Sequence, residues 1–189
     1  MIAMLNTSEK LYTPHLISVV DYQKMAQIGI LSRDARVELI EGEIVDMAPI
    51  GSKHAAYVTR LTRELLHAVG YDAIVFVQNP IILGDLSEPE PDLALLKPKA
   101  NDYEDALPQA EDILLLIEVA DSTIDYDRQI KAPLYAHFSI PEYWLINIEE
   151  RSIILFQKPI QRQFTSITTL PLPASLSPIL LPQIQIALK

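Results

Sequence analysis

Apolar residues recur along this chain with two periods, one typical of helices and one typical of strands. Residues 53–69 carry apolar positions every three or four residues, which predicts an amphipathic helix that ends at Gly70. These positions are Ala55, Val58, Leu61, Leu65 and Val69. Residues 113–120 are almost continuously apolar, as in a strand at the middle of a sheet, and residues 92–96 predict a shorter buried strand.

Two short segments that alternate between apolar and charged residues predict a β-hairpin over residues 37–46, with Glu41 and Gly42 at its turn. The expected cross-strand pairs are Ile40 with Glu43 and Glu38 with Val45. Because residues opposite each other share a face of the ribbon, Glu38 and Glu43 should lie on the same face.

Other elements follow from caps, prolines and further apolar runs. They are a helix over 18–28 with Ser18 as N-cap and Gly29 as its stop, a strand over 73–83, a helix over 125–138, and a strand pair over 142–148 and 152–157. Pro80 marks a bulge or an edge of its strand, and Pro133 should kink its helix or begin a second one. Residues 97–112 predict a surface loop that need not be ordered, and the tail from residue 170 predicts an extended arm with an edge strand.

These elements predict a mixed α/β or α+β fold with a central sheet, and the 189 residues suit one domain over 1–189 with peripheral arms over 1–14 and 171–189. No apolar run is long enough to cross a bilayer and the N-terminus lacks a signal-peptide pattern, so a cytoplasmic protein without a membrane partner is expected. The absence of cysteine excludes disulfides and thiolate metal sites. A formal charge of −10 argues against broad attraction to nucleic acid.

Three acidic residues stand at ends of predicted strands. Asp92 begins one buried strand, Glu118 lies near the end of another, and Glu38 lies in the hairpin. Two neighbouring carboxylates repel each other unless a cation such as Mg²⁺ joins them. The alternatives are structural: Glu118 could be paired with an arginine or capped by backbone amides, and Pro-Asp is common in turns.

A lysine on the next predicted helix bears on this choice. Asp127, Lys131 and Tyr135 are spaced four residues apart and so lie along one helical face. A single lysine on a helix is usually a solvated surface residue. Here it follows the acidic strand closely enough for its long side chain to reach back to the strand end.

In their order, the motifs of this chain resemble the Uma2 (DUF820) family of the PD-(D/E)xK restriction-endonuclease-like superfamily. They are VELIEGEIVDMAP (37–49), His54 in GSKH, EPEPDLALL (88–96), LLIEVADSTIDYDRQIKAPLYA (115–136) and IPEYWLIN (140–147). The resemblance implies a restriction-endonuclease-like mixed central sheet flanked by helices, with an N-terminal hairpin. It further implies a Mg²⁺- or Mn²⁺-dependent nuclease site.

The resemblance assigns roles to individual residues. Asp92 and Glu118 correspond to the two acidic metal ligands of the superfamily, with the Ala120 backbone carbonyl as a further ligand. Glu38 corresponds to the upstream acid of such sites and could also bind the metal. The superfamily places lysine two residues after the second acid, where this chain has Ala120, so Lys131 is the expected replacement. Possible phosphate contacts are His54, Arg60 and Arg63, although a histidine at a helix start is more often a cap or a structural residue.

The implied activity is metal-dependent endonucleolytic hydrolysis of phosphodiester bonds in nucleic acid, with DNA as the expected partner. By analogy with restriction enzymes, a homodimer is also expected. The alternative is a non-catalytic interaction or nucleic-acid-binding module that retains the nuclease fold, since a fold alone does not establish activity.

Overall fold

A six-stranded mixed sheet forms the centre of the computed structural model, which describes residues 12–32 and 34–188. The strand order is β3-β4-β5-β6-β7-β8, and neighbouring strands are antiparallel except β5 and β6, which are parallel. The strands are β3 Ile74–Val77, β4 Leu93–Leu96, β5 Ile113–Ala120, β6 Glu142–Asn147, β7 Ser152–Ile160 and β8 Gln163–Pro171. The predicted central strand over 113–120 is confirmed with the same bounds.

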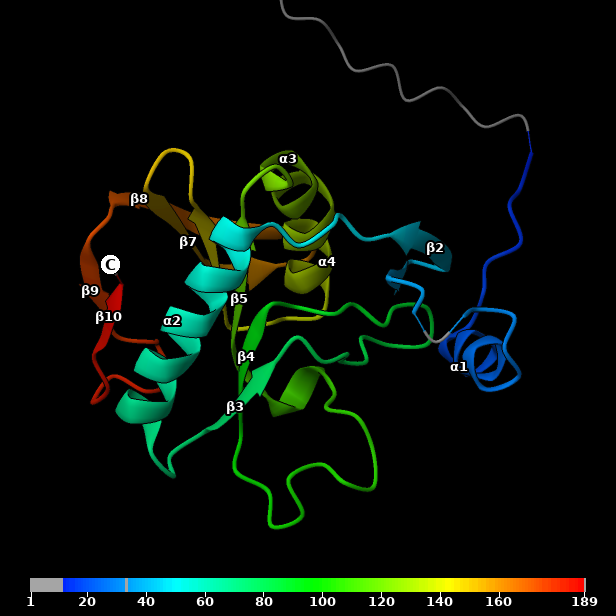
Figure 1. Cartoon of the computed structure of the whole chain (residues 1–189), viewed down its shortest axis with the longest axis horizontal. Coiled ribbons are helices and arrows are strands. Elements are labelled where there is room, and N and C mark those ends of the chain that lie inside the picture. The colour runs from blue at the N-terminus through cyan, green and yellow to red at the C-terminus, as the bar shows by residue number, and fades with distance from the viewer. Residues whose placement is uncertain (1–11, 33, 189) are drawn as a thin grey trace, which may run out of the picture.

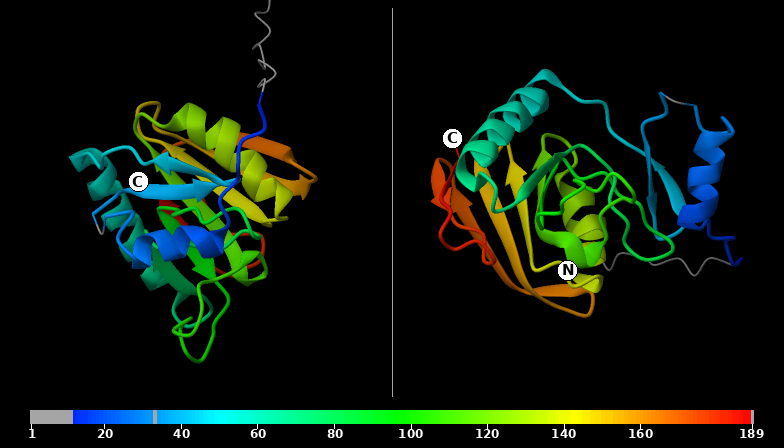
Figure 2. Two further views of the ribbon diagram at one scale, coloured as in Figure 1. Left: turned by 90° about the vertical axis from the view of Figure 1, so that its right-hand side faces the viewer. Right: turned by 90° about the horizontal axis from the view of Figure 1, so that it is seen from below.

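Helices cover both faces of this sheet (Figures 1 and 2). One face is covered by α2 (Ser52–Val69) and by a small two-stranded sheet of β9 (Ala174–Leu176) and β10 (Ile186–Leu188). The other is covered by a continuous helical segment made of α3 (Ile124–Tyr126), η2 (Asp127–Lys131) and α4 (Ala132–His137). Pro133 lies in the first turn of α4, directly after the π-helical turn of η2, and the helical segment continues through it without a break.

Alternation along β5 divides the core between the two faces. Leu116 and Ala120 pack with Tyr135 of α4, whereas Ile117 and Val119 belong to the core beneath α2. Glu118 has the same parity as Leu116 and Ala120, so its carboxylate points toward the α3–α4 side. Period-two geometry therefore places this acid where the following helix can contact it.

The N-terminal part forms a separate layer beyond α4 (Figure 2, right). It contains α1 (Val19–Gln27) and the hairpin of β1 (Val37–Ile40) and β2 (Glu43–Asp46). Ser18 caps α1 by accepting a hydrogen bond from the Asp21 amide, as predicted. The hairpin register is also as predicted, and Gly42 provides the positive φ of 83° that its turn requires.

Several predicted boundaries differ from the structure. The strand predicted over 73–83 ends at Val77, because Gln78 has a φ of 47° and the backbone then pairs with loop residues instead of a strand. Ala55 is exposed, and Tyr57 takes its place on the buried face of α2. No strand is predicted over 163–169, yet β8 forms the sheet edge there.

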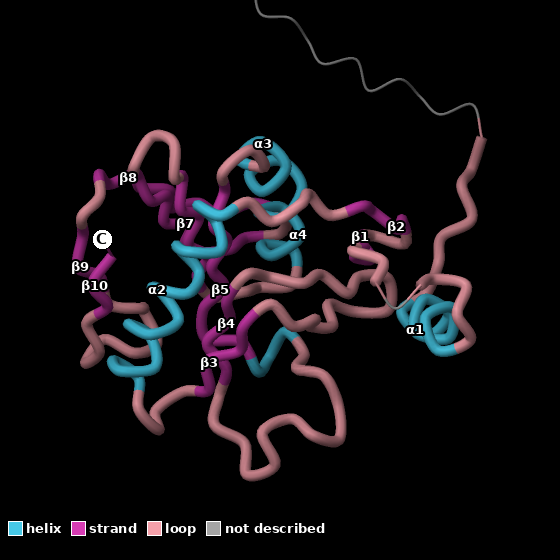
Figure 3. The backbone as a smooth tube through the Cα atoms, viewed as in Figure 1, coloured by secondary structure: helices cyan, strands magenta, loops and turns pink. Residues whose placement is uncertain are grey.

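The remaining segments are the loop over 97–112 and the two terminal arms. The loop over 97–112 projects from the lower end of the sheet in Figure 3, and its last residues form the short helix η1 (Ala110–Asp112). The C-terminal arm packs against the sheet, with Ile186 and Leu188 buried. Of the predicted N-terminal arm, residues 1–11 lie outside the described residues. Within the described ranges, no helix is both long enough and apolar enough to span a bilayer.

Candidate active site

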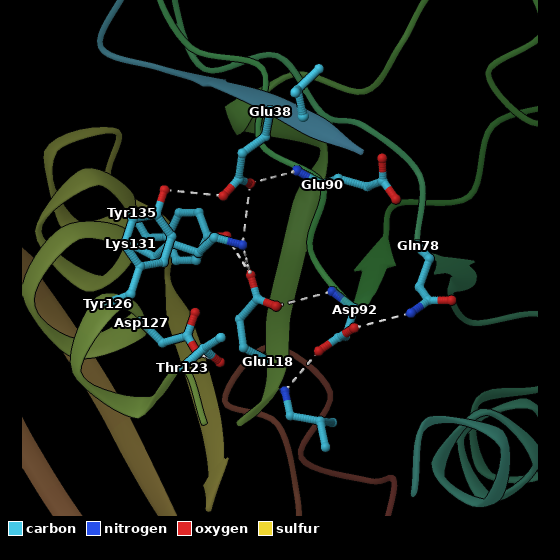
Figure 4. A network of polar contacts seen from close by, with 12 residues as sticks. Glu38, Gln78, Glu90, Asp92, Glu118, Thr123, Tyr126, Asp127, Lys131 and Tyr135 are labelled. Carbon is cyan, nitrogen blue, oxygen red and sulfur yellow. Dashed lines mark hydrogen bonds and ion pairs between the residues drawn. The ribbon is translucent and has the colours of Figure 1, made fainter. Parts of the chain in front are cut away.

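Antiparallel pairing brings the first acid of one strand beside the last acid of its neighbour. Leu93 of β4 pairs with Ile117 of β5, so Asp92 and Glu118 become neighbours. The Asp92 amide donates to Glu118 Oε2 at 3.1 Å, and the Val119 amide donates to Asp92 Oδ2 at 2.9 Å (Figure 4). The two predicted acids therefore share one site.

Lys131 also reaches this site, from η2. Its Nζ lies 2.9 Å from Glu118 Oε1 and 3.3 Å from Glu38 Oε2, and its side chain is only 6% exposed. Tyr135 Oη donates to the same Glu118 oxygen at 2.9 Å. Residues 127–131 form a π-helical turn, which sets the angle at which Lys131 leaves the helix. The face shared by Asp127, Lys131 and Tyr135 is thus turned inward.

Glu38 comes from the hairpin and completes the ring of charges around Lys131. Tyr126 Oη donates to Glu38 Oε1 at 3.1 Å, and the Glu90 amide donates to Glu38 Oε2 at 3.3 Å. With Lys131, three donors surround this carboxylate, and the Glu38 side chain is 3% exposed. Glu38 holds Lys131 in place here.

Burial dominates the electrostatics of this cluster. It raises the pKa of Glu118 to about 8, although the Lys131 ammonium beside it opposes that rise. Burial also disfavours the charged form of Lys131, but Glu118, Glu38 and Asp127 together raise its pKa above the ordinary value. Burial likewise raises the pKa of Asp127, against the pull of Lys131. Burial therefore favours the neutral forms of Glu118 and Asp127, and the Lys131 ammonium beside them favours the charged forms.

His54 lies at the start of α2 and contacts the Asp92 carboxylate. Its Nε2 lies 2.9 Å from Asp92 Oδ2, and Gln78 Nε2 donates to Asp92 Oδ1 at 3.2 Å. Burial acts to raise the pKa of Asp92, but the hydrogen bonds from His54, Val119 and Gln78 lower it overall. The same bond to Asp92 raises the pKa of His54. His54 thus orients the Asp92 carboxylate, which fits the predicted structural role, and its phosphate contact stays a prediction.

These groups lie in a pocket of about 270 Å³ between the β2–α2 connection and the loop after β5. Its carboxylates are Glu38, Asp46, Glu90, Asp92, Glu118, Asp121 and Asp127, and its permanent cations are Arg36 and Lys131. Arg60 and Arg63 do not line this pocket. They flank a smaller hollow beside the end of β10, where Arg60 lies over the Tyr57 ring. The arginine that lines the acidic pocket is Arg36.

The carboxylates of this pocket provide part of the coordination shell that a hard divalent cation needs. Among residues 12–32 and 34–188, no three His, Cys, Asp or Glu side chains are grouped closely enough to hold a metal ion. Asp92 and Glu118 still offer two adjacent carboxylates, and Mg²⁺ commonly uses one or two carboxylates and keeps several waters. Two acids with a backbone oxygen are therefore a suitable partial shell.

The predicted backbone ligand needs correction. The Ala120 carbonyl accepts a hydrogen bond from the Ile148 amide at 3.0 Å, so it points toward β6 and away from Asp92. Successive backbone groups of a strand point to opposite sides. Since the Val119 amide donates to Asp92, the Val119 carbonyl lies on that side as well. Val119 is the residue whose carbonyl borders the acids.

Two contributors could not be singled out from the sequence. Gln78 follows a strand and contacts Asp92, and Arg36 precedes the hairpin and borders the pocket. Glutamine and arginine at such positions carry no distinctive pattern. Only the packing of separate elements reveals them.

The fold and this site define a restriction-endonuclease-like protein with a Lys-bridged acidic pocket. The sequence model of the Uma2 family, described as "Putative restriction endonuclease", matches residues 19–189, and the chain belongs to that family. A similar solved structure is titled as a putative nuclease of DUF820 from Anabaena variabilis. It has a TM-score of 0.67 and 18% identity, and the match covers 86% of this chain and 89% of the other. No curated protein matches.

Proposed function

We propose that this protein is a metal-dependent endonuclease that hydrolyses phosphodiester bonds in nucleic acid, with DNA as the substrate. The observation that carries the proposal is the contact of Lys131 Nζ with Glu118 at 2.9 Å, while the other Glu118 oxygen is bonded to the Asp92 amide. Two acids and a lysine from three separate elements converge in one pocket. This buried charge network costs desolvation energy, and a catalytic use of its groups accounts for that cost.

The metal would be Mg²⁺ or Mn²⁺, held by Asp92, Glu118 and the Val119 carbonyl. When bound, such an ion supplies a Lewis acid and an activated water for attack on phosphorus. His54 and Gln78 fix the Asp92 carboxylate in one orientation, with bonds of 2.9 and 3.2 Å. Tyr135 and the Asp92 amide do the same for Glu118.

Lys131 has an electrostatic role in this proposal. Its buried ammonium is held by Glu38 and Glu118, so it is preorganised to stabilise negative charge that develops on the phosphate. Glu38 and Tyr126 position Lys131 without contacting the substrate. Arg36 at the pocket edge would attract a neighbouring phosphate and offset part of the acidity.

The acidity of the pocket favours a second candidate function, that of a non-catalytic binding module. Seven carboxylates against two permanent cations disfavour a polyanion when no metal is bound. A non-catalytic module that binds a cationic or neutral partner would suit that charge equally well. The two functions differ in whether divalent metal promotes strand cleavage.

The test incubates purified protein with plasmid and with single-stranded DNA in the presence of Mg²⁺ or Mn²⁺. Variants Asp92→Asn, Glu118→Gln and Lys131→Met should each lower the cleavage rate by about a hundredfold or more. Matched exposed controls, Glu150→Gln and Lys24→Met, should cleave like the parent protein. Cleavage that survives all three site substitutions would come from a contaminant and would contradict the proposal. The proposal would also be wrong if the parent protein cleaved neither substrate with either metal ion.

A further inference from the structure

The candidate reacting groups lie at the bottom of the pocket. The side chains of Glu38, Glu118 and Lys131 are 3%, 5% and 6% exposed, and Asp92 is 14% exposed. A phosphate must therefore enter the pocket to meet them. Enzymes that must bring a base into a recessed pocket act on single strands or take the nucleotide out of the stack.

The pocket volume of about 270 Å³ is comparable to the size of one nucleotide. It lies slightly below the range of about 300–1,000 Å³ that is common for small-molecule sites. This size matches an unpaired nucleotide whose neighbours remain outside.

Two walls of different chemistry face each other across this space. The acids and Lys131 form one wall, and the connection from β2 to α2 forms the other, which Figure 1 shows crossing from the hairpin to the start of α2. The apolar lining of that wall is Val45 of β2 with Met47, Ala48, Pro49 and Ile50 of the connection. Ile50 is 42% exposed, so an apolar side chain is left open at the pocket. A nucleotide offers the matching pair of surfaces, an apolar base face and a charged phosphate.

Charge supports the same substrate class. A single strand has a lower charge density than a duplex, which carries one charge per about 1.7 Å of axis. The excess of carboxylates at this pocket therefore repels a duplex more strongly.

We infer that the pocket takes one unpaired nucleotide of a single DNA strand, with the base against the apolar wall at Ile50 and the phosphate toward Asp92 and Lys131. This inference rests on the proposed nuclease function and specifies its substrate. Duplex DNA is then a substrate only where a nucleotide is unpaired, as at a bulge or a frayed end.

The test uses one labelled DNA oligonucleotide without self-complementarity in three forms: single-stranded, fully paired, and paired with a one-nucleotide bulge. With Mg²⁺, the single strand should be cleaved at least about tenfold faster than the paired form, and the bulged form should be cleaved at its bulge. Ile50→Ala should raise KM for the single strand about fivefold with little change in kcat. The matched control Ile160→Ala, at an exposed isoleucine outside the pocket, should leave both unchanged.

Binding separates failure of this inference from failure of the proposed function. Fluorescence anisotropy with Asp92→Asn should show tighter binding of the single strand than of the paired form, and Ile50→Ala in that background should weaken it. Preferred single-strand binding without any cleavage by the parent protein would keep the inference and overturn the nuclease proposal. Equal cleavage of paired and single-stranded DNA, or an Ile50→Ala effect no larger than that of Ile160→Ala, would overturn the inference and keep the nuclease.

Discussion

Lys131 Nζ lies between Glu118 Oε1, at 2.9 Å, and Glu38 Oε2, at 3.3 Å, so one ammonium joins carboxylates that belong to different sheets. Glu118 comes from the central sheet and Glu38 from the N-terminal hairpin. The contact therefore ties the hairpin layer to the core at the same point where the candidate chemistry lies. Stability and activity should respond together when this lysine is changed.

Lys131→Met should lower the free energy of unfolding by about 3–5 kcal/mol, because it leaves two buried carboxylates without their cation. Urea denaturation measures the loss. The double variant Lys131→Met with Glu118→Gln should lose less than the sum of the single variants, since the buried charge is removed with its partner. Additive losses would mean that the pair is not energetically coupled.

His54→Ala should weaken divalent-metal binding about tenfold to a hundredfold, because Asp92 loses the bond that orients it. Isothermal titration with Mn²⁺ measures the affinity directly. His67→Ala is a suitable control, since His67 is exposed on the same helix. If both variants bind Mn²⁺ like the parent protein, His54 does not position Asp92 for the metal.

Glu142→Ala should destabilise the fold by about 3 kcal/mol without removing any group of the pocket. The carboxylate of Glu142 is buried and accepts hydrogen bonds from the Trp144 indole, the Gln157 amide and the Ile179 backbone at 2.7–2.8 Å. Its removal leaves these donors without acceptors and loosens the C-terminal arm. Thermal unfolding reports the stability, and faster proteolysis after β9 reports the arm. A loss below about 1 kcal/mol would mean that water replaces the carboxylate.

Titration of Glu88 should make the stability of the parent protein depend on pH. Burial raises the pKa of Glu88 above the ordinary 4.5, while the Gln23 amide bond opposes this. The native state therefore holds the proton more tightly than the unfolded state, so this contribution to stability falls as pH rises from 4.5 through the raised pKa.

Glu88→Gln should consequently be more stable than the parent protein at pH 8, with the difference vanishing near pH 4. The substituted amide oxygen can still accept from Gln23. Urea midpoints at the two pH values measure this, and Glu149→Gln, at an exposed turn, should show no such trend. A Glu88→Gln variant that is less stable at both pH values would show that the carboxylate is held by favourable contacts.

Local pattern was enough for much of the architecture. The run over 113–120 is β5 with the same bounds, and the hairpin has its predicted register. These features depend on period-two alternation, on turn residues and on burial of apolar runs, all of which act over short separations in the chain. The shortened strand before Pro80 and the overlooked β8 depend instead on which backbone groups find partners across the sheet.

The two acids and the lysine could be named as candidates from the chain through its resemblance to the family, and period-two geometry aims Glu118 at the following helix. Only the tertiary structure decided what each of them contacts. Packing of the hairpin brought Glu38 to Lys131, and the start of α2 brought His54 to Asp92. Strand pairing turned the Ala120 carbonyl away and left Val119 beside the acids. Such contacts join residues far apart in sequence, and no local periodicity constrains the distance between elements that meet only when the chain has folded.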